Sequence, residues 1–315
     1  MAKTIKFNLK CDNASIRTLD DLREHFCIQD VLNYYKNGLL TRWLDVQGYA
    51  EELGKINDIK SSSDEDLVVQ ISKILNVECD ENVIKESLTI IEYEKNNDSI
   101  HQKYADGLDK EYDVLKSYQT RYEELLNKIV ENNEDYSKIK AATKILIKDF
   151  SWMLDLDFEN LFYKMKNLAP LALFCFVSFD ELRKYYVPEL IVAADGRESL
   201  DVDVQYGDIE KCRYYENKRR IYNCMCKFLQ EESLKCILKD NLKIFSENTD
   251  SYWKDIEPDE TKRFMILSMG SESRVRALKD KGTELRSGDV NNMFVILKGI
   301  DFKNNYNNSL LYMEV

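Results

Sequence analysis

Two aspartates and an acid–x–lysine element could together carry metal-dependent chemistry. In the stretch LDVDV, Asp201 and Asp203 are two residues apart, and an extended strand would place both carboxylates on one side. Glu216 and Lys218 follow in the sequence ENK. Carboxylates that hold Mg²⁺, with a lysine that stabilises charge, are the minimal set for cleaving a phosphodiester. A metal-dependent nuclease with Mg²⁺ as its cofactor is therefore one hypothesis.

One feature of the sequence weighs against that nuclease, and the motifs of other enzyme classes are absent. Enzymes of the PD-(D/E)xK type present these residues on adjacent strands, whereas YYENKRRIYNCMCKFL has a helical pattern. The chain also contains no G-x-x-x-x-G-K-[ST], G-x-G-x-x-G, G-x-S-x-G or H-E-x-x-H motif. We therefore favour a non-enzymatic protein without a cofactor, in which residues 189–210 form an acidic loop beside a basic helix.

Basic side chains gather in two segments that could bind nucleic acid or an acidic partner. The first, KCRYYENKRR, interleaves arginines with tyrosines, which can pair with phosphates and stack on bases. The second, residues 262–286, contains seven basic and three acidic residues. A nucleic-acid-binding module is therefore an alternative hypothesis. The arginines that we expect to contact a partner are Arg213, Arg219, Arg220, Arg274 and Arg276.

Composition limits these hypotheses. The 315 residues carry 45 basic and 57 acidic side chains, a net charge of −12, so the surface as a whole is not built to hold a polyanion. The eight cysteines include no C-x-x-C pair and are accompanied by two histidines, so we expect reduced thiols rather than a zinc site.

The apolar run LAPLALFCFVSF is shorter than the roughly 20 residues of a membrane helix. We expect a cytoplasmic protein with no membrane insertion.

The spacing of apolar residues predicts a mainly α fold with a small β-rich end, an α+β architecture. Residues 3–10 alternate like a strand, and residues 15–59 contain four short helices punctuated by Gly38 and Gly48. Ser15 or Thr18 could cap the first of these helices. SSSDEDLVVQISKILNV begins a longer helix at Ser62 or Ser63, and a further helix carries Val83, Ile84, Leu88 and Ile91 inward. We place the end of this N-terminal helical domain at residue 97.

The central domain, residues 98–250, is expected to contain a long antiparallel helical hairpin over residues 100–155. Tyrosines recur along its first helix at coiled-coil-like spacing, and the hydroxyls favour a wet surface for self-association or a protein partner. The second helix runs from Ile139 to Leu154. Core helices follow over residues 158–188, and helix returns over residues 211–247. The predicted partner-binding tyrosines are Tyr104, Tyr112, Tyr118 and Tyr122.

The last domain, residues 251–315, is predicted to be β-rich. Its strands are RFMILSM, SRVRAL, MFVILKGI and LLYMEV, separated by polar turns. The final strand is apolar to its last residue, so we expect Leu310 to Val315 to be docked on the domain.

Two segments resemble parts of known proteins. SIRTLDDLREHFCIQDVLNYYKNGLLTRWLDVQGYAEELGKI is similar to a small helical module that accompanies varied domains in uncharacterised bacterial proteins. The tail GIDFKNNYNNSLLYMEV resembles a bacterial family without an assigned activity. The resemblance implies a bacterial cytoplasmic accessory subunit of a stress-response or phage-defence system, and it transfers no catalytic residue. The sequence thus favours an adaptor, sensor or regulatory subunit that acts by binding.

Overall fold

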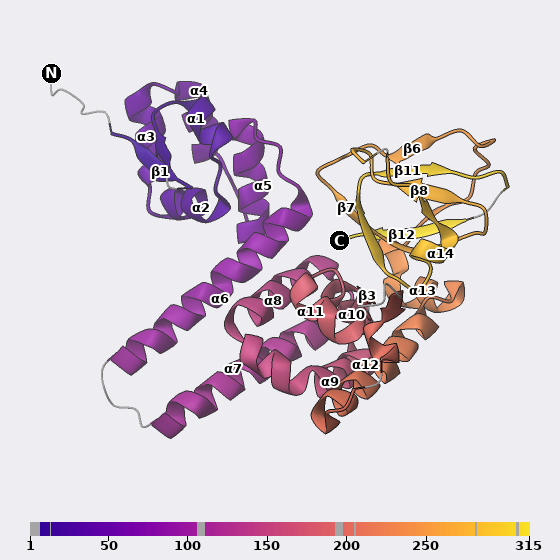
Figure 1. Ribbon diagram of the computed structural model, residues 1–315. Helices are drawn as coiled ribbons and strands as arrows, with labels where there is room; N and C mark the ends of the chain where they lie inside the picture. Colours follow the sequence, from indigo (N-terminus) through magenta and orange to yellow (C-terminus); the bar gives the residue numbers. More distant parts are fainter. Residues whose placement is uncertain are drawn as a thin grey trace, which may run out of the picture. The chain divides into compact units, whose positions relative to one another are not determined.

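The computed structural model describes residues 7–12, 14–105, 111–192, 198–204, 206–280, 282–306 and 309–315, and it confirms the mainly helical α+β class (Figure 1). The chain divides into two compact units. The first runs to Leu125 and includes Lys140–Ile145, and the second comprises Leu126–Ile139 and Leu146–Val315. None of the described helices is both long enough and apolar enough to cross a membrane.

The first unit begins with a short hairpin, β1 (Leu9–Cys11) paired antiparallel with β2 (Ala14–Ile16). Residues 3–6 of the predicted strand lie outside the described residues. Ser15 lies in β2, and the N-cap of the first helix is Thr18, whose hydroxyl accepts a hydrogen bond from the Asp21 amide while the Asp21 carboxylate accepts one from the Thr18 amide.

Five short helices follow the hairpin and enclose its apolar side. Ser63, one of the two serines predicted as the cap, caps the last of them and precedes three acidic residues. Gly48, with φ of 92°, ends the third helix in the left-handed conformation that glycine adopts without strain. Trp43 on that helix is fully buried in the shared core. The helices are α1 (Leu19–Glu24), α2 (Ile28–Lys36), α3 (Leu39–Gln47), α4 (Ala50–Asn57) and α5 (Asp64–Leu75).

Three longer helices come next: α6 (Glu81–Ala105), α7 (Glu111–Glu131) and α8 (Tyr136–Asp149). The predicted boundary at residue 97 falls inside α6, because the helix continues through NNDS. Val83, expected to face inward, is 50% exposed, while Ile84 is buried. Glu86 on α6 lies 2.6 Å from Lys144 Nζ and 3.3 Å from Lys140 Nζ, which ties residues 140–145 to the first unit.

The predicted helix from Ile139 to Leu154 is interrupted at one residue. Phe150, with φ of −127° and ψ of 25°, ends α8 and precedes α9 (Ser151–Leu168). Its ring is fully buried. The local apolar spacing continues across this position, so the break has no signal in the sequence pattern.

The core of the second unit is the apolar segment between residues 158 and 188, as predicted. It forms the second half of α9, then α10 (Pro170–Phe176) and α11 (Asp180–Tyr186), and every side chain from Leu171 to Val177 is buried. Pro170 occupies the first turn of α10, where its missing amide proton leaves no helical hydrogen bond unmade. Two further helices, α12 (Ile209–Phe228) and α13 (Glu231–Leu238), complete the helical part of the unit.

The C-terminal part of the second unit, residues 243–315, contains two four-stranded antiparallel sheets with a common apolar core, and we call it the β-domain. The four predicted strands are confirmed, and MFVILKGI is divided into two strands. Residues 243–245 form a strand instead of the predicted helix. The order of one sheet is β10 (Val295–Lys298), β7 (Arg263–Met269), β12 (Leu310–Glu314) and β5 (Lys243–Phe245). The order of the other is β6 (Lys254–Glu257), β11 (Ile300–Lys303), β8 (Arg274–Arg276) and β9 (Leu285–Arg286).

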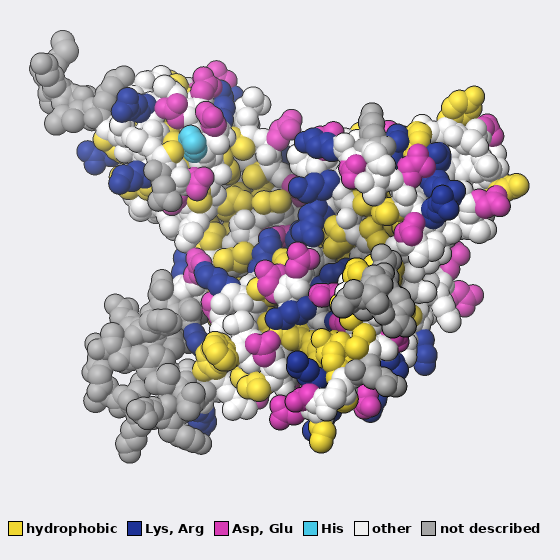
Figure 2. Space-filling model, viewed as in Figure 1, with side chains coloured by type: hydrophobic (Ala, Val, Ile, Leu, Met, Phe, Trp, Pro, Cys, Tyr) yellow, Lys and Arg dark blue, Asp and Glu magenta, His cyan; other side chains and the backbone are white. Residues whose placement is uncertain are grey.

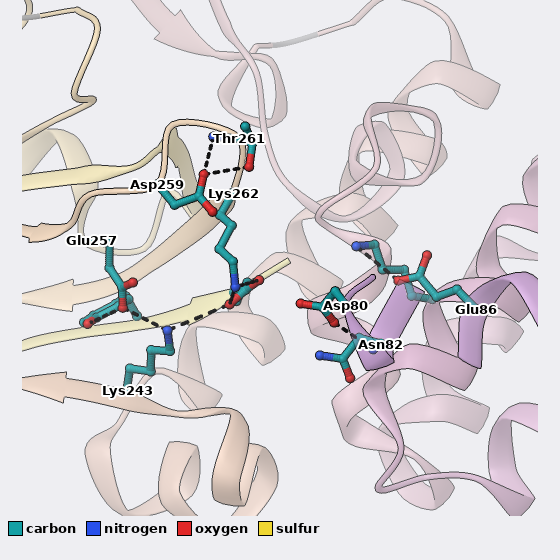
Figure 3. A network of polar contacts seen from close by, with 11 residues as sticks. Asp80, Asn82, Glu86, Lys243, Glu257, Asp259, Thr261 and Lys262 are labelled. Atoms are coloured by element: carbon teal, nitrogen blue, oxygen red, sulfur yellow. Dashed lines mark hydrogen bonds and ion pairs between the residues drawn. The ribbon is translucent and has the colours of Figure 1, made fainter. Parts of the chain in front are cut away.

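The C-terminal strand is docked, as expected. β12 lies between β7 and β5, and the Val315 amide donates a hydrogen bond of 2.9 Å to the Arg263 carbonyl. A polar network joins the two sheets (Figure 3): Glu257 on β6 accepts hydrogen bonds from Lys243 on β5 and from the Tyr312 hydroxyl on β12, each at 2.9 Å. Burial and this bond with Glu257 raise the pKa of Tyr312 well above its usual value.

Arg183 on α11 attaches the β-domain to the helical core. Its guanidinium donates hydrogen bonds to the carbonyls of Phe294 at 2.9 Å and Met293 at 2.5 Å, and to that of Val177 at 3.1 Å. Burial lowers the pKa of this guanidinium from its usual value. The β-domain is therefore held on the helices by charge-assisted hydrogen bonds in a partly desolvated site.

Candidate anion-binding face of the C-terminal β-domain

The sheet β6-β11-β8-β9 has one apolar face and one charged face. Val275, Phe302 and Leu285 point into the core of the β-domain. Because side chains alternate along a strand, their neighbours in sequence lie on the opposite face. This outer face carries Arg274, Arg276, Arg286, Asp301 and Lys303.

Three cations stand in one row across this face. Lys303 on β11 is directly opposite Arg274 on β8, and Arg274 is directly opposite Arg286 on β9. We call these three residues the cationic row. Neighbouring strands are about 4.8 Å apart, and like charges directly opposite one another destabilise a sheet.

One carboxylate neutralises one end of the cationic row. Lys303 Nζ lies 3.3 Å from the Glu284 carboxylate, and both side chains are partly exposed. Arg274 Nη1 donates to the carbonyl of Ser273 at 3.1 Å. Within the described part of the chain, neither Arg274 nor Arg286 forms an ion pair. The row therefore has an excess of positive charge at its β8 and β9 positions.

The next row contains an ion pair and a second carboxylate, because Asp255 on β6 is directly opposite Asp301. Arg276 and Asp301 are directly opposite one another, with Arg276 Nε 2.9 Å and Nη2 2.7 Å from Asp301 Oδ2. The guanidinium carbon lies 3.8 Å from the centre of the Trp253 ring, and Lys303 Nζ lies 4.3 Å from it. Cations over an indole are attracted by its negative π face. Trp253 thus helps to fix the positions of Arg276 and Lys303.

The face can attract an anion without a general excess of positive charge on the protein. Acidic and basic side chains are interspersed over the visible surface of the β-domain (Figure 2). A partner whose carboxylates or phosphates approach Arg274 and Arg286 would relieve the repulsion within the cationic row. Arginine suits this role because its planar donors can grip an oxyanion at two points.

The sequence identified part of this site. Arg274 and Arg276 were expected to contact a partner, and RVR predicts that they share one strand face. The structure separates their roles, since Arg276 is committed to Asp301 and Arg274 is not. Lys303, Arg286 and Trp253 were missed, because the pairing of β8 with β11 and β9 depends on register between distant segments.

The four residues of the nuclease hypothesis do not form one constellation. Residues 201–203 form a 3₁₀ turn, so Asp201 and Asp203 do not share the face of a strand. Asp201 is buried, and its Oδ2 lies 2.6 Å from the Nζ of buried Lys218. Asp203 is exposed and pairs with Arg219 at 3.2 Å. The predicted common side for the two aspartates is wrong because a turn replaces the extended conformation.

Glu216 points away from this ion pair. It lies on α12 two residues before Lys218, and it is exposed whereas Lys218 is buried. Across the described residues, no group of three or more His, Cys, Asp or Glu side chains could hold a metal ion. All eight cysteines lie in the described residues and are free thiols.

The tyrosines beside these charges pack within the chain. Tyr215 stacks on Tyr206 with 4.2 Å between ring centres, and Tyr214 lies 5.5 Å from the ring centre of Phe158. Burial, with a smaller contribution from Tyr215, raises the pKa of Tyr214 to about 12. Arg219 donates to the Val202 carbonyl and pairs with Asp203, yet it is exposed, as are Arg213 and Arg220.

The predicted tyrosine surface is described only in part. The side chains of Tyr104 and Tyr112 lie outside the described residues. Tyr118 is partly exposed, and Arg121 lies 5.9 Å from its ring centre. Tyr122 is buried, so in this conformation its side chain is not at the surface.

Comparisons with known proteins add no residue to this set. The chain matches no protein-family model, no curated protein and no solved structure. The functional candidates are thus the residues that the fold itself brings together, foremost the cationic row.

Proposed function

We propose that this chain is a non-enzymatic interaction protein whose C-terminal β-domain binds an acidic segment of a protein partner. The observation that carries the proposal is the cationic row, in which Lys303, Arg274 and Arg286 face one another across three strands with one carboxylate beside them. A sheet that keeps this repulsion in the free state gains when carboxylates bind. With the bacterial resemblance of the sequence, this role fits an adaptor or regulatory subunit of a cytoplasmic stress-response or phage-defence assembly.

An acidic protein segment suits the site better than single-stranded nucleic acid. Proteins that bind single strands use aromatic faces on which bases stack. The aromatic side chain at this face is Trp253, and Arg276 and Lys303 already lie over its ring. A base would have to displace a cation that is also held by a carboxylate. Carboxylates need only approach the arginines of the row.

The experiment measures binding of a fluorescent oligoglutamate peptide and of a fluorescent single-stranded oligonucleotide by fluorescence anisotropy. The double substitution Arg274→Gln/Arg286→Gln removes two charges of the row, and Lys227→Gln/Lys298→Gln removes two exposed charges elsewhere in the same unit. We expect peptide binding that the first variant loses and the second retains. Tighter binding of the oligonucleotide than of the peptide, dependent on the same arginines, would favour the nucleic-acid-binding alternative instead.

A further inference from the structure

The helix α9 has a second apolar face, which is exposed in the described part of the chain. Trp152 is 79% exposed and Leu156 84% exposed, and Tyr163 on the same helix is also exposed. Leu156 follows Trp152 by four positions and Tyr163 follows Leu156 by seven, which places all three on one face of an α-helix. We call them the α9 stripe. Hydrophobic side chains are visible at the surface in this region (Figure 2).

The α9 stripe lies opposite the face that forms the core. Leu154, Phe158, Leu161, Phe162 and Met165 are buried on the inner side of α9. An amphipathic helix needs only one such face to fold, and its outer face is normally polar. Large apolar side chains gathered on an outer face mark an interaction site more often than isolated ones do.

The charges beside the α9 stripe are segregated along the helix. Asp155, Asp157 and Glu159 lie in its first half, which has no basic residue, and Lys164 and Lys166 lie in its second half, which has no acidic residue. This order suits the helix macrodipole within one chain. It also makes the face self-complementary: in an antiparallel pair, the acidic half of each helix meets the basic half of the other.

We infer that the α9 stripe binds a second copy of this chain, forming a two-fold symmetric dimer with the two α9 helices antiparallel. A two-fold axis between Glu159 and Asn160 places Leu156 opposite Tyr163 of the second copy. On one flank of the contact, the same axis places Asp155 near Lys166 of the second copy. An isologous contact requires this kind of self-complementary patch. The dimer contact is separate from the cationic row, which lies on the β-domain.

The charged residues of the face are compatible with this pairing. Asp155 accepts a hydrogen bond from the Tyr185 hydroxyl and lies 3.7 Å from Lys184 Nζ, yet its side chain is more than half exposed. Lys166, on the same flank as Asp155, is partly exposed. One helix of 18 residues is about 27 Å long, so the contact is small and we expect dissociation in the micromolar range.

Site-directed crosslinking tests the geometry. Asn160 and Asn167 are both exposed asparagines on α9, so Asn160→Cys and Asn167→Cys are matched variants of the full chain. Near the axis, the two thiols introduced at position 160 of a dimer are neighbours. The two copies of position 167 are about 22 Å apart along the helices. We expect a short bis-maleimide to join Asn160→Cys into dimers well above the background of the native thiols, and to leave Asn167→Cys at that background.

Sedimentation over about 1–100 µM protein gives the second measurement. We expect Leu156→Ala to weaken dimerisation about tenfold or more, and Ile209→Ala, which truncates an exposed apolar side chain on α12, to leave it unchanged. A protein that stays monomeric throughout, or equal crosslinking at positions 160 and 167, would overturn the inference. Because binding of the acidic peptide is measured separately, failure of one proposal is distinguishable from failure of the other.

Discussion

Lys218 and Asp201 form a buried ion pair, with Nζ 2.6 Å from Oδ2, that holds the acidic loop on α12. The Asp201 carboxylate also accepts a hydrogen bond from the Glu189 amide at 3.2 Å, and its carbonyl accepts one from the Tyr206 hydroxyl at 2.9 Å. Two residues whose types suit metal-dependent catalysis therefore anchor a turn. The charge of each residue offsets the cost of burying the charge of the other.

Breaking this ion pair from one side should destabilise the second unit strongly. Lys218→Met leaves the Asp201 carboxylate buried without a cation, which typically costs about 3–5 kcal/mol. Asp201→Asn/Lys218→Met removes both charges and should be clearly less destabilised than Lys218→Met alone. Urea unfolding of the three proteins measures the difference. Equal stability of the single variant and the original chain would show that the pair is solvated in solution.

Alkaline pH should weaken the fold through buried tyrosines. Burial raises the pKa of Tyr214 and of Tyr222 to about 12, whereas an unfolded tyrosine titrates near pH 10. Between about pH 10 and pH 12 the native state thus holds more protons than the unfolded state, so the free energy of unfolding falls as pH rises. Below about pH 10 these groups contribute no pH dependence.

Tyr214→Phe tests this assignment, because phenylalanine keeps the packing on Phe158 and removes the titrating hydroxyl. We expect the loss of stability above about pH 10 to become shallower, by at most one proton. Urea unfolding at several alkaline pH values, with tyrosinate absorbance as a second readout, gives the slope. An unchanged slope would mean that Tyr214 titrates normally in the native state.

Arginines of the charged sheet face should respond to substitution with opposite signs. Arg286→Gln and Arg274→Gln each relieve repulsion in the cationic row and should raise the free energy of unfolding by about 0.5 kcal/mol at low salt. Arg276→Gln should lower it by about 3 kcal/mol, because Asp301 stays buried without its cation. The gain at the row should shrink as salt is added, since exposed charges are screened. Urea unfolding at two salt concentrations measures both effects. Destabilisation by Arg286→Gln would contradict the arrangement of the row.

Local patterns in the sequence were sufficient for most elements. The apolar run in RFMILSM predicted β7 at its observed bounds, and the serines before three acidic residues predicted the start of α5. Contacts between distant residues were decisive elsewhere. LDVDV has the pattern of a strand, yet residues 201–203 form a 3₁₀ turn in which Asp201 makes a buried ion pair with Lys218.

The candidate site shows the same division. That Arg274 and Arg276 share a strand face follows from their spacing in RVR. That Lys303 and Arg286 stand on either side of Arg274 follows only from strand register, which the turns and the apolar core determine together. The α9 stripe had no distinct signal, because α9 is apolar on both of its faces and the pattern does not say which one is outside.

Binding of the oligoglutamate peptide by the charge variants tests the central claim most directly. The proposal predicts that Arg274→Gln/Arg286→Gln abolishes the rise in anisotropy while remaining folded, and that Lys227→Gln/Lys298→Gln binds as the original chain does. Equal loss in both double variants, or peptide binding that survives removal of both arginines, would contradict the assignment of the cationic row as the binding face.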